Sequence, residues 1–412
     1  MTTTSTQTTA GTRGACRRAC IIASLAAAQC AHAETTATDP GIGTFYANFN
    51  LRQERVQEDN ALADASAMTL RTRLGYLSPE WRGFSALVEL EDSRIVAGQD
   101  EFTVGPTAFN PGRYAVIADP ESTELDQGYL QFEEGTFVAK LGRQVINRDD
   151  QRFVGSVDWR QDRQTFDAVS FGWAPHAGID MEYAYVTKRN RVFADLADVD
   201  SKDQLINGHF VTPVGTFAAY AYLLETDEAD ADAIDTLGLR FHGSAKKPIG
   251  TLSWALEYAS QDQEQGAAGH SADYLLAEGG VSIRGVTLTL GHERLGSDDG
   301  GYGFATPLAT LHKFNGWADQ FLVTPAQGLL DTYLSLGSTF RGAKWQLVYH
   351  DFTADEPVAG ADDFGTEIDA AATWTFADHY TLGAKVAFYS AGDEPSVRVD
   401  TDKFWIWFTA GF

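Results

Sequence analysis

The chain has 412 residues, a formal net charge of −26 at pH 7, 44% hydrophobic residues and 12% aromatic residues. This acidic balance argues against a nucleic-acid partner, because phosphate binding depends on basic patches. All three cysteines, Cys16, Cys20 and Cys30, lie near the N-terminus. No later stretch approaches 18 consecutive apolar residues, so the sequence predicts no transmembrane helix.

The N-terminus has the pattern of a secretory signal peptide. Arg13, Arg17 and Arg18 precede the apolar run 20–28, and the small-x-small sequence Ala31-His32-Ala33 follows it. That run is too short for a membrane anchor, so we expect cleavage after Ala33. The mature chain then has no cysteine, which excludes disulfides, thiol catalysis and cysteine-ligated metal. We therefore predict a signal peptide over 1–33 and one barrel domain over 34–412.

Alternating apolar and polar residues predict about eighteen β-strands, because side chains two residues apart share one face of a strand. The predicted strands are 44–52, 67–75, 84–91, 125–133, 136–143, 166–174, 179–187, 205–211, 215–224, 234–242, 252–260, 273–283, 286–293, 330–338, 344–351, 366–376, 380–389 and 403–412.

The gaps between these strands alternate between short and long. Short gaps are 134–135, 174–178, 212–214, 284–285, 341–343 and 377–379, and long gaps are 92–124, 144–165, 188–204, 261–272, 294–329 and 352–365. An even strand count with this rhythm predicts an all-β, transmembrane antiparallel barrel with short periplasmic turns and long external loops. A β-sandwich would not show such asymmetry between its ends, and a solenoid would show a repeat.

The C-terminal strand gives the clearest membrane signal. Its alternate residues are apolar, and the chain stops at Phe412. An apolar strand left at the edge of a soluble sheet invites aggregation, so we expect this strand to face lipid and to pair with the first strand. The prediction places the protein in the outer membrane of a Gram-negative cell, in contact with lipid and lipopolysaccharide. It also predicts recognition of the strand ending at Phe412 by the barrel-assembly machinery.

Several cations have the parity of the polar face of their strands, and others lie in the dense segment 141–173. A charge facing lipid costs roughly 2–4 kcal/mol at the bilayer midplane, so strand cations should face the lumen. Guanidinium groups there would attract anionic solutes, or they would pair with wall acids such as Glu89, Glu133, Glu182, Glu257 and Glu293 and stiffen the barrel. The predicted pore-lining set is Arg52, Arg71, Arg73, Lys140, Arg143, Arg160, Arg163, Arg240, Lys313 and Lys385.

The segment 141–173 spans one of the long gaps and alternates arginine with aspartate. Arg143 shares parity with Leu141, which predicts a position at the end of the strand beyond the lipid band. The rest of the segment either folds inward and narrows the channel or forms a solvated salt-bridge network outside. Periodicity does not separate these alternatives.

Four motifs resemble the alginate-export family of outer-membrane porins: residues 141–173, LHKFNGWADQF (311–321), LVYHDF (347–352) and DTDKFWIWFTAGF (400–412). The resemblance implies an eighteen-stranded barrel and a cation-lined pore for an acidic polysaccharide. It also implies pore or loop positions for Arg71, Arg73, Arg143, Arg160 and Lys313. Two departures weaken the exporter reading: the loops are short, and Leu322 stands where the family pattern continues into a further arginine.

Together these patterns predict a passive channel for hydrophilic solutes that favours anions, with acidic (uronate) saccharides as its solutes. A dedicated polysaccharide exporter and a non-selective porin are the alternatives. A barrel hydrolase is a distant third, because neither GxSxG nor HExxH occurs. The acidic stretches 225–235, 296–301 and 355–363 are interpreted as a solvated rim rather than as sites for Ca²⁺ or Mg²⁺. No enzyme activity, cofactor or metal is predicted.

Overall fold

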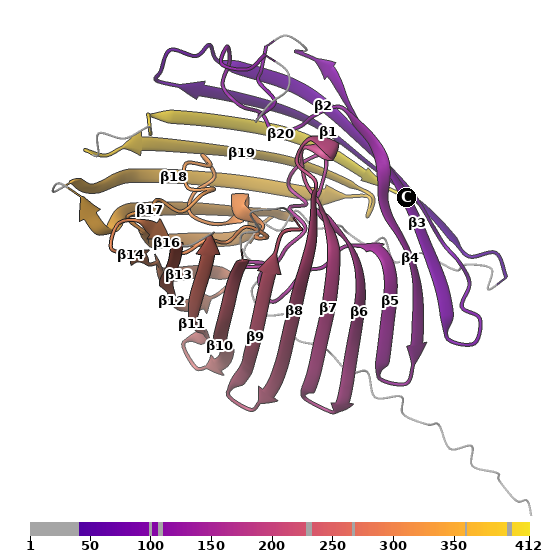
Figure 1. Ribbon diagram of the computed structural model, residues 1–412. Coiled ribbons are helices and arrows are strands. Elements are labelled where there is room, and N and C mark those ends of the chain that lie inside the picture. The colour runs from indigo at the N-terminus through magenta and orange to yellow at the C-terminus, as the bar shows by residue number, and fades with distance from the viewer. Residues whose placement is uncertain are drawn as a thin grey trace, which may run out of the picture.

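Eighteen antiparallel strands form one sheet that closes on itself, because the last strand pairs with the first (Figure 1). The computed structural model describes residues 41–98, 101–105, 110–227, 233–265, 268–358, 361–393 and 398–412. The predicted signal peptide lies outside these residues, as do parts of the acidic stretches 225–235 and 355–363. The closed eighteen-stranded barrel confirms the predicted fold class.

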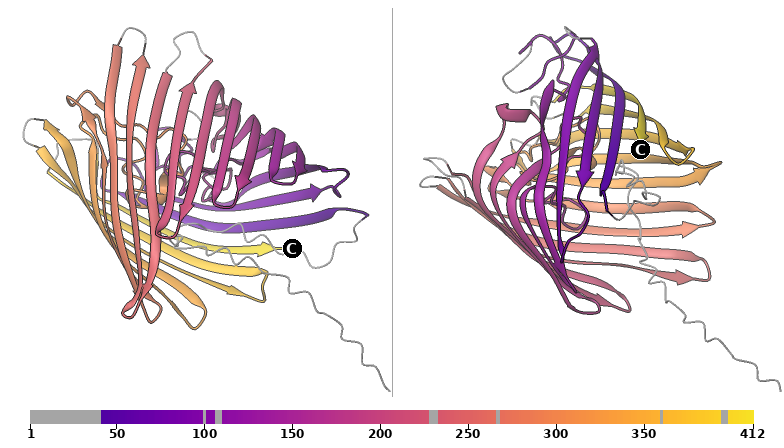
Figure 2. Two further views of the ribbon diagram at one scale, coloured as in Figure 1. Left: turned by 90° about the horizontal axis from the view of Figure 1, so that it is seen from below. Right: turned by 90° about the vertical axis from the view of Figure 1, so that its right-hand side faces the viewer.

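The barrel strands follow one another around the wall in sequence order (Figure 2). They are β1 (Thr44–Glu58), β2 (Ala65–Leu77), β3 (Phe84–Ala97), β4 (Ser122–Glu134), β5 (Phe137–Gln144), β6 (Thr165–His176), β7 (Ile179–Asn190), β8 (Val199–Thr212), β9 (Gly215–Glu225), β10 (Ala233–Lys247), β11 (Gly250–Gln265), β12 (Ala268–Ile283), β13 (Val286–Leu295), β16 (Leu329–Phe340), β17 (Ala343–Val358), β18 (Ala361–Phe376), β19 (Tyr380–Ala391) and β20 (Thr401–Gly411). A small hairpin, β14 (Ser297–Asp298) with β15 (Tyr302–Gly303), and two 3-10 turns, η1 (Ala194–Leu196) and η2 (Leu311–Lys313), complete the described elements. Among the residues that the structure describes, no helix is long and apolar enough to cross a membrane.

The two faces of each strand differ as the alternation predicts. On β2, Leu74 is 52% exposed on the outer face, whereas Arg71 and Arg73 are buried on the inner face. On β20, Ile406 is 60% exposed, whereas its neighbour Trp405 is buried. An apolar outer face is stable only against lipid, so this pattern agrees with a membrane-spanning wall.

Short turns lie at the end of the barrel where β1 begins and β20 ends. In the β12–β13 connection, Arg284 and Gly285 both have positive φ, at 52° and 85°. Positive φ at both central residues is the type I′ geometry that suits the twist of a two-residue hairpin. At the other end, the predicted loop 261–272 is mostly strand, because β11 and β12 extend past the apolar alternation. Outside the membrane neither face must be apolar, so the ladder continues where the sequence pattern has stopped.

Three connections fold into the lumen instead of projecting outward: residues 145–164, residues 296–328 and the described residues of a third, 98, 101–105 and 110–121 (Figure 1). The apolar side chains of 145–164 and 296–328, among them Phe153, Trp159, Phe304 and Trp317, are buried in one hydrophobic cluster with residues of the inner wall. Those of the described part of 98–121, among them Phe102 and Ile117, form a second cluster with residues of β1 and β2. Of the two alternatives for the dense segment, the structure therefore has the inward one. The barrel has its core inside the ring of strands, around these loops.

Candidate constriction of the channel

Two of the inward connections meet inside the barrel, and we call residues 145–164 and 296–328 the constriction loops. Val154 and Leu308 form a parallel bridge between them. The Gly155 N–H donates to the Leu308 carbonyl at 2.8 Å, and the Gln164 side-chain amide donates to the same carbonyl at 3.1 Å. Backbone groups that are buried must find partners, and here each loop supplies partners for the other. The constriction loops are thus one bonded unit.

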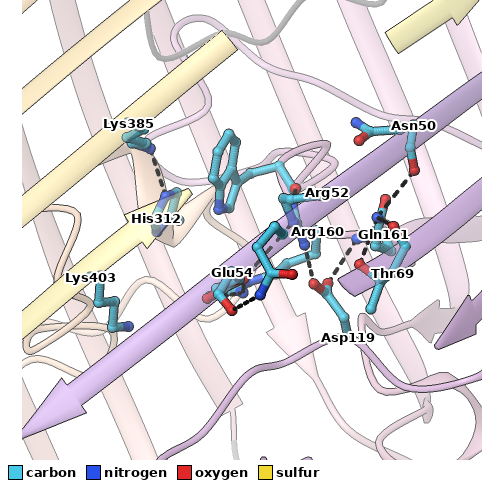
Figure 3. A network of polar contacts seen from close by, with 12 residues as sticks. Asn50, Arg52, Glu54, Thr69, Asp119, Arg160, Gln161, His312, Lys385 and Lys403 are labelled. Atoms are coloured by element: carbon cyan, nitrogen blue, oxygen red, sulfur yellow. Dashed lines mark hydrogen bonds and ion pairs between the residues drawn. The ribbon is translucent and has the colours of Figure 1, made fainter. Parts of the chain in front are cut away.

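An aromatic cage fixes this unit to the wall. Trp159 stacks on His312 with ring centroids 4.9 Å apart. The Lys385 ammonium of β19 lies 4.0 Å from the Trp159 ring centroid and 4.1 Å from that of Trp317. Lys385 also donates to His312 Nε2 at 2.7 Å (Figure 3). A desolvated cation against indole rings gains roughly 2 kcal/mol, so Lys385 holds the loops as well as facing the lumen.

Two arginines join the same unit to β1. Arg52 donates to the Trp159 carbonyl and pairs with Asp119, which lies on the third inward loop (Figure 3). Arg160 lies between Glu54 at 3.2 Å and Asp319 at 3.0 Å, and so bridges both constriction loops to the wall. Burial would raise the pKa of Asp119, but the Arg52 and Arg160 guanidiniums hold it below its usual range.

Asp319 is the acidic centre of this cluster. It accepts from His312 Nδ1 at 2.6 Å and pairs with Lys403 of β20 at 2.8 Å. Burial would raise the pKa of Asp319, but these partners and Arg160 keep it well below its usual range. His312 accepts a hydrogen bond from Lys385 at Nε2, so its single ring proton lies on Nδ1 and the imidazole is neutral.

A second cluster lies where the 145–164 loop meets β2, β3 and β4. Arg163 contacts Glu89 and Asp126 at 2.6 Å each and Asp158 at 3.3 Å. Arg73 pairs with Glu91 and lies 3.6 Å from Asp126. Each guanidinium here has carboxylate partners, so the cluster adds rigidity more than net positive charge. Nearby on β2, Arg71 donates to Asn48 at 2.9 Å.

The remaining predicted pore residues lie apart from these clusters. Arg240 pairs with Glu257 and lies 2.7 Å from Asp150, while Lys313 donates to the Asp150 carbonyl. Lys140 is half-buried and lies 4.7 Å from the Tyr129 ring centroid. Arg143 has the outward parity of Leu141 at the end of β5, pairs with Asp167 at 2.7 Å and lies 3.9 Å from Glu124.

Sequence reasoning missed several residues of the constriction. Lys403 shares parity with Trp405 on β20, so the period-two pattern could have placed it on the inner face. Trp159 lies in the motif 141–173, and His312 and Asp319 lie in the motif 311–321, but nothing in the sequence indicated that they would meet. Asp119 lies in a loop without periodicity, and no signal pointed to it. Of the wall acids named as alternative partners, four pair with arginines: Glu89 with Arg163, Glu182 with Arg148, Glu257 with Arg240 and Glu293 with Arg152.

Comparison with known proteins agrees with this architecture. OccAB4 of Acinetobacter baumannii has a TM-score of 0.69 at 14% identity, over 91% of this chain and 100% of that chain. OccK9 (OpdG) of Pseudomonas aeruginosa has a TM-score of 0.70 at 14% identity, over 89% and 98%. OpdK of Pseudomonas aeruginosa, in a structure with vanillate, has a TM-score of 0.66 at 12% identity, over 89% and 98%. Likeness at these identities shows the fold.

The sequence comparisons give the family. No curated protein sequence matches the chain. The alginate export family model, in contrast, matches residues 43–291, which is more than half of the chain. Together with the closed barrel and its lipid-facing surface, this match points to a channel rather than to an enzyme. The chain therefore belongs to the alginate export family and is an outer-membrane β-barrel of the porin type.

Proposed function

We propose that the protein is a passive channel for small hydrophilic solutes, that it favours anions, and that acidic (uronate) saccharides are among its solutes. The observation that carries the proposal is the bonded unit of constriction loops across the lumen. An eighteen-stranded barrel leaves a wide aqueous lumen when it is not filled. Loops fixed across that lumen limit passage to small molecules.

The anion preference rests on lysines rather than on the arginine set. Guanidiniums such as Arg160 and Arg163 already have buried carboxylate partners, which leaves little charge for a solute. Lys140 and Lys313 are half-buried, and among the described residues neither ammonium has a carboxylate within 4.0 Å. These two cations are available for a solute carboxylate. OpdK, which has the same fold, was crystallised with vanillate, a carboxylate-bearing solute.

The second candidate function is that of a dedicated polysaccharide exporter, and the family match favours it. A long polyuronate would require the constriction loops to leave the lumen. Their anchors at Arg52, Arg160 and Lys385 are buried and oppose that movement. We therefore place small solutes ahead of a polymer.

Two proposals concern targeting. We infer that residues 1–33 are a signal peptide cleaved after Ala33, which leaves 34–412 as the barrel domain. We also infer that the strand ending at Phe412 is recognised by the barrel-assembly machinery. In the folded barrel, the Phe412 N–H donates to the Ala47 carbonyl at 2.9 Å, so recognition would precede closure of β20 onto β1.

The reversal potential of the purified protein in a planar bilayer under a KCl gradient tests the function. We expect anion selectivity that falls when uronate oligomers are added and stays when neutral sugars of equal size are added. Cation selectivity would contradict the anion preference. Equal effects of both sugars would favour a non-selective porin, and absence of conductance would exclude an open channel.

A further inference from the structure

Three carboxylates from three different segments converge beside the second cluster. Glu91 lies on β3, Glu124 on β4 and Asp162 on the 145–164 loop, and one oxygen of each lies within 4.8 Å of the others. Glu91 and Glu124 are direct cross-strand partners in the β3–β4 ladder. Like charges opposite each other destabilise a sheet, so this arrangement requires a compensating positive group.

Three of the carboxylate oxygens at this point have no hydrogen-bond partner in the described part of the chain. Asp162 is only 1% exposed, and its carboxylate meets the Glu124 carboxylate while neither of its oxygens accepts from an N–H or hydroxyl donor. Glu91 Oε1 is also buried without a partner. The next cross-strand pair on the same face of the ladder is Ser93 with Ser122, and both of its hydroxyl oxygens are buried without a hydrogen-bond partner. Unpaired buried acceptors are costly, so their gathering in one place points to a ligand.

The charges around this point do not balance. The carboxylates in this neighbourhood are Glu89, Glu91, Glu124, Asp126, Asp158, Asp162 and Asp167. The guanidiniums that face them are Arg71, Arg73, Arg143 and Arg163. Seven carboxylates against four guanidiniums leave three negative charges, and the nearby pair of Asp198 with Lys188 does not change this difference.

We propose that Glu91, Glu124 and Asp162 bind Ca²⁺. The donors are all oxygen, which suits a hard cation and disfavours metals that select nitrogen or sulfur. Calcium–oxygen bonds are about 2.3–2.6 Å long, so oxygens as far as about 5 Å apart can share one ion. Three carboxylates, each able to bind through one or two oxygens, approach the coordination that Ca²⁺ requires. Mg²⁺ usually keeps several waters and suits so buried a site less well.

The position of this site gives the ion a structural role. Asp162 lies between Arg160, which binds the β1 wall, and Arg163, which binds the β3–β4 wall. Calcium bound to Glu91, Glu124 and Asp162 joins the 145–164 loop to the wall between these two anchors. The inference concerns how the constriction is held and does not depend on which solute passes.

Equilibrium dialysis of the purified, chelator-treated barrel against radioactive Ca²⁺ tests the site. We compare the wild type with Asp162→Asn and with Glu124→Gln. Asp195→Asn is the matched control, because Asp195 is an exposed acid on the separate 191–198 connection. We expect the wild type and the control to bind one Ca²⁺ per chain more than the two site variants. Equal binding by all four proteins would overturn the proposal.

Thermal unfolding of the same proteins gives a second readout that requires no folded Asp162→Asn variant. Ca²⁺ should raise the unfolding midpoint of the wild type and of Asp195→Asn, and Mg²⁺ at the same concentration should raise it less. Glu124→Gln should lose most of the calcium effect. A wild-type midpoint that does not respond to Ca²⁺ would overturn the calcium site.

Discussion

Trp159 and His312 lie face to face with an interplanar angle of 10°, and this stack links the two constriction loops. The same indole meets the ring of Trp407 on β20 edge-on, with centroids 5.3 Å apart. One side chain therefore joins both loops to the wall. Aromatic pairs of these geometries contribute beyond their buried area, so Trp159 is a central contact of the constriction.

Replacing this indole should widen the channel. Trp159→Ala removes the buried ring, which should destabilise the docking of the loops on the wall by about 3–5 kcal/mol. The substitution also removes one of the aromatic rings that surround the Lys385 ammonium. Single-channel recordings should show higher conductance and more frequent fluctuations than the wild type. Trp81→Ala is the control, because Trp81 is 66% exposed at a short turn. Equal conductance in both variants would show that the stack does not hold the constriction.

Acidification should loosen the same contact through His312. Burial lowers the pKa of His312 well below its usual value; Lys385 and Arg160 lower it further, while Asp319 opposes them. A folded-state pKa below the unfolded value of about 6.5 gives stability that is present above pH 6.5 and lost as the pH falls. Asp319 has a lowered pKa and stays ionised across this window, so it does not cause the change.

The measurement is the conductance and the thermal midpoint of the wild type and His312→Gln between pH 7 and pH 5. We expect the wild type to lose stability and to fluctuate more at pH 5. His312→Gln should be less stable than the wild type at pH 7, but its stability should change less between pH 7 and pH 5. A wild-type profile that is flat, or that rises on acidification, would contradict the assignment of a neutral His312.

The wall of this protein could be predicted strand by strand. Each predicted strand matches one barrel strand, because lipid imposes a period-two pattern wherever the chain crosses the membrane. The dependence of the pattern on lipid also explains why the predicted strand boundaries are wrong at the external end of the barrel. β17 continues to Val358, well past the predicted end at 351, because its outer residues no longer meet lipid.

The constriction could be predicted only in part. Alternation placed Arg52 on the buried side of β1, but its partner Asp119 lies 67 residues away in an irregular loop. Arg152 and Glu293, which are paired at 2.7 Å, are separated by 141 residues. Contacts between an inward loop and a distant strand produce no periodic pattern of residues in the sequence. A single chain therefore shows which side chains face inward but not which of them meet.

Arg160 should be the most sensitive ionic anchor. In Arg160→Ala, Glu54 and Asp319 remain buried without their shared guanidinium, which should cost about 3–5 kcal/mol of loop docking. Denaturant unfolding and conductance should both report the loss. Lys202→Ala removes an exposed pair with Asp227 and should cost less than about 1 kcal/mol. Similar losses in the two variants would contradict a special role for Arg160.

The anion preference should depend on Lys140 and Lys313. Neutralising an ammonium that has no close carboxylate removes net positive charge from the lumen, whereas neutralising a paired arginine also releases a carboxylate. The double variant Lys140→Gln/Lys313→Gln should therefore shift the reversal potential toward cations while its stability stays close to that of the wild type. Lys202→Gln serves as the control for charge at the external rim.

Ionic strength separates this effect from a change of loop position. Charges that act on a solute in the lumen are screened as salt rises, since the Debye length falls from about 10 Å at 0.1 M to about 3 Å at 1 M. The difference between the wild type and the double variant should thus shrink in concentrated KCl. A difference that persists at 1 M would mean that the substitutions have moved the constriction loops, and the lysines would then act as anchors rather than as the charges that select anions.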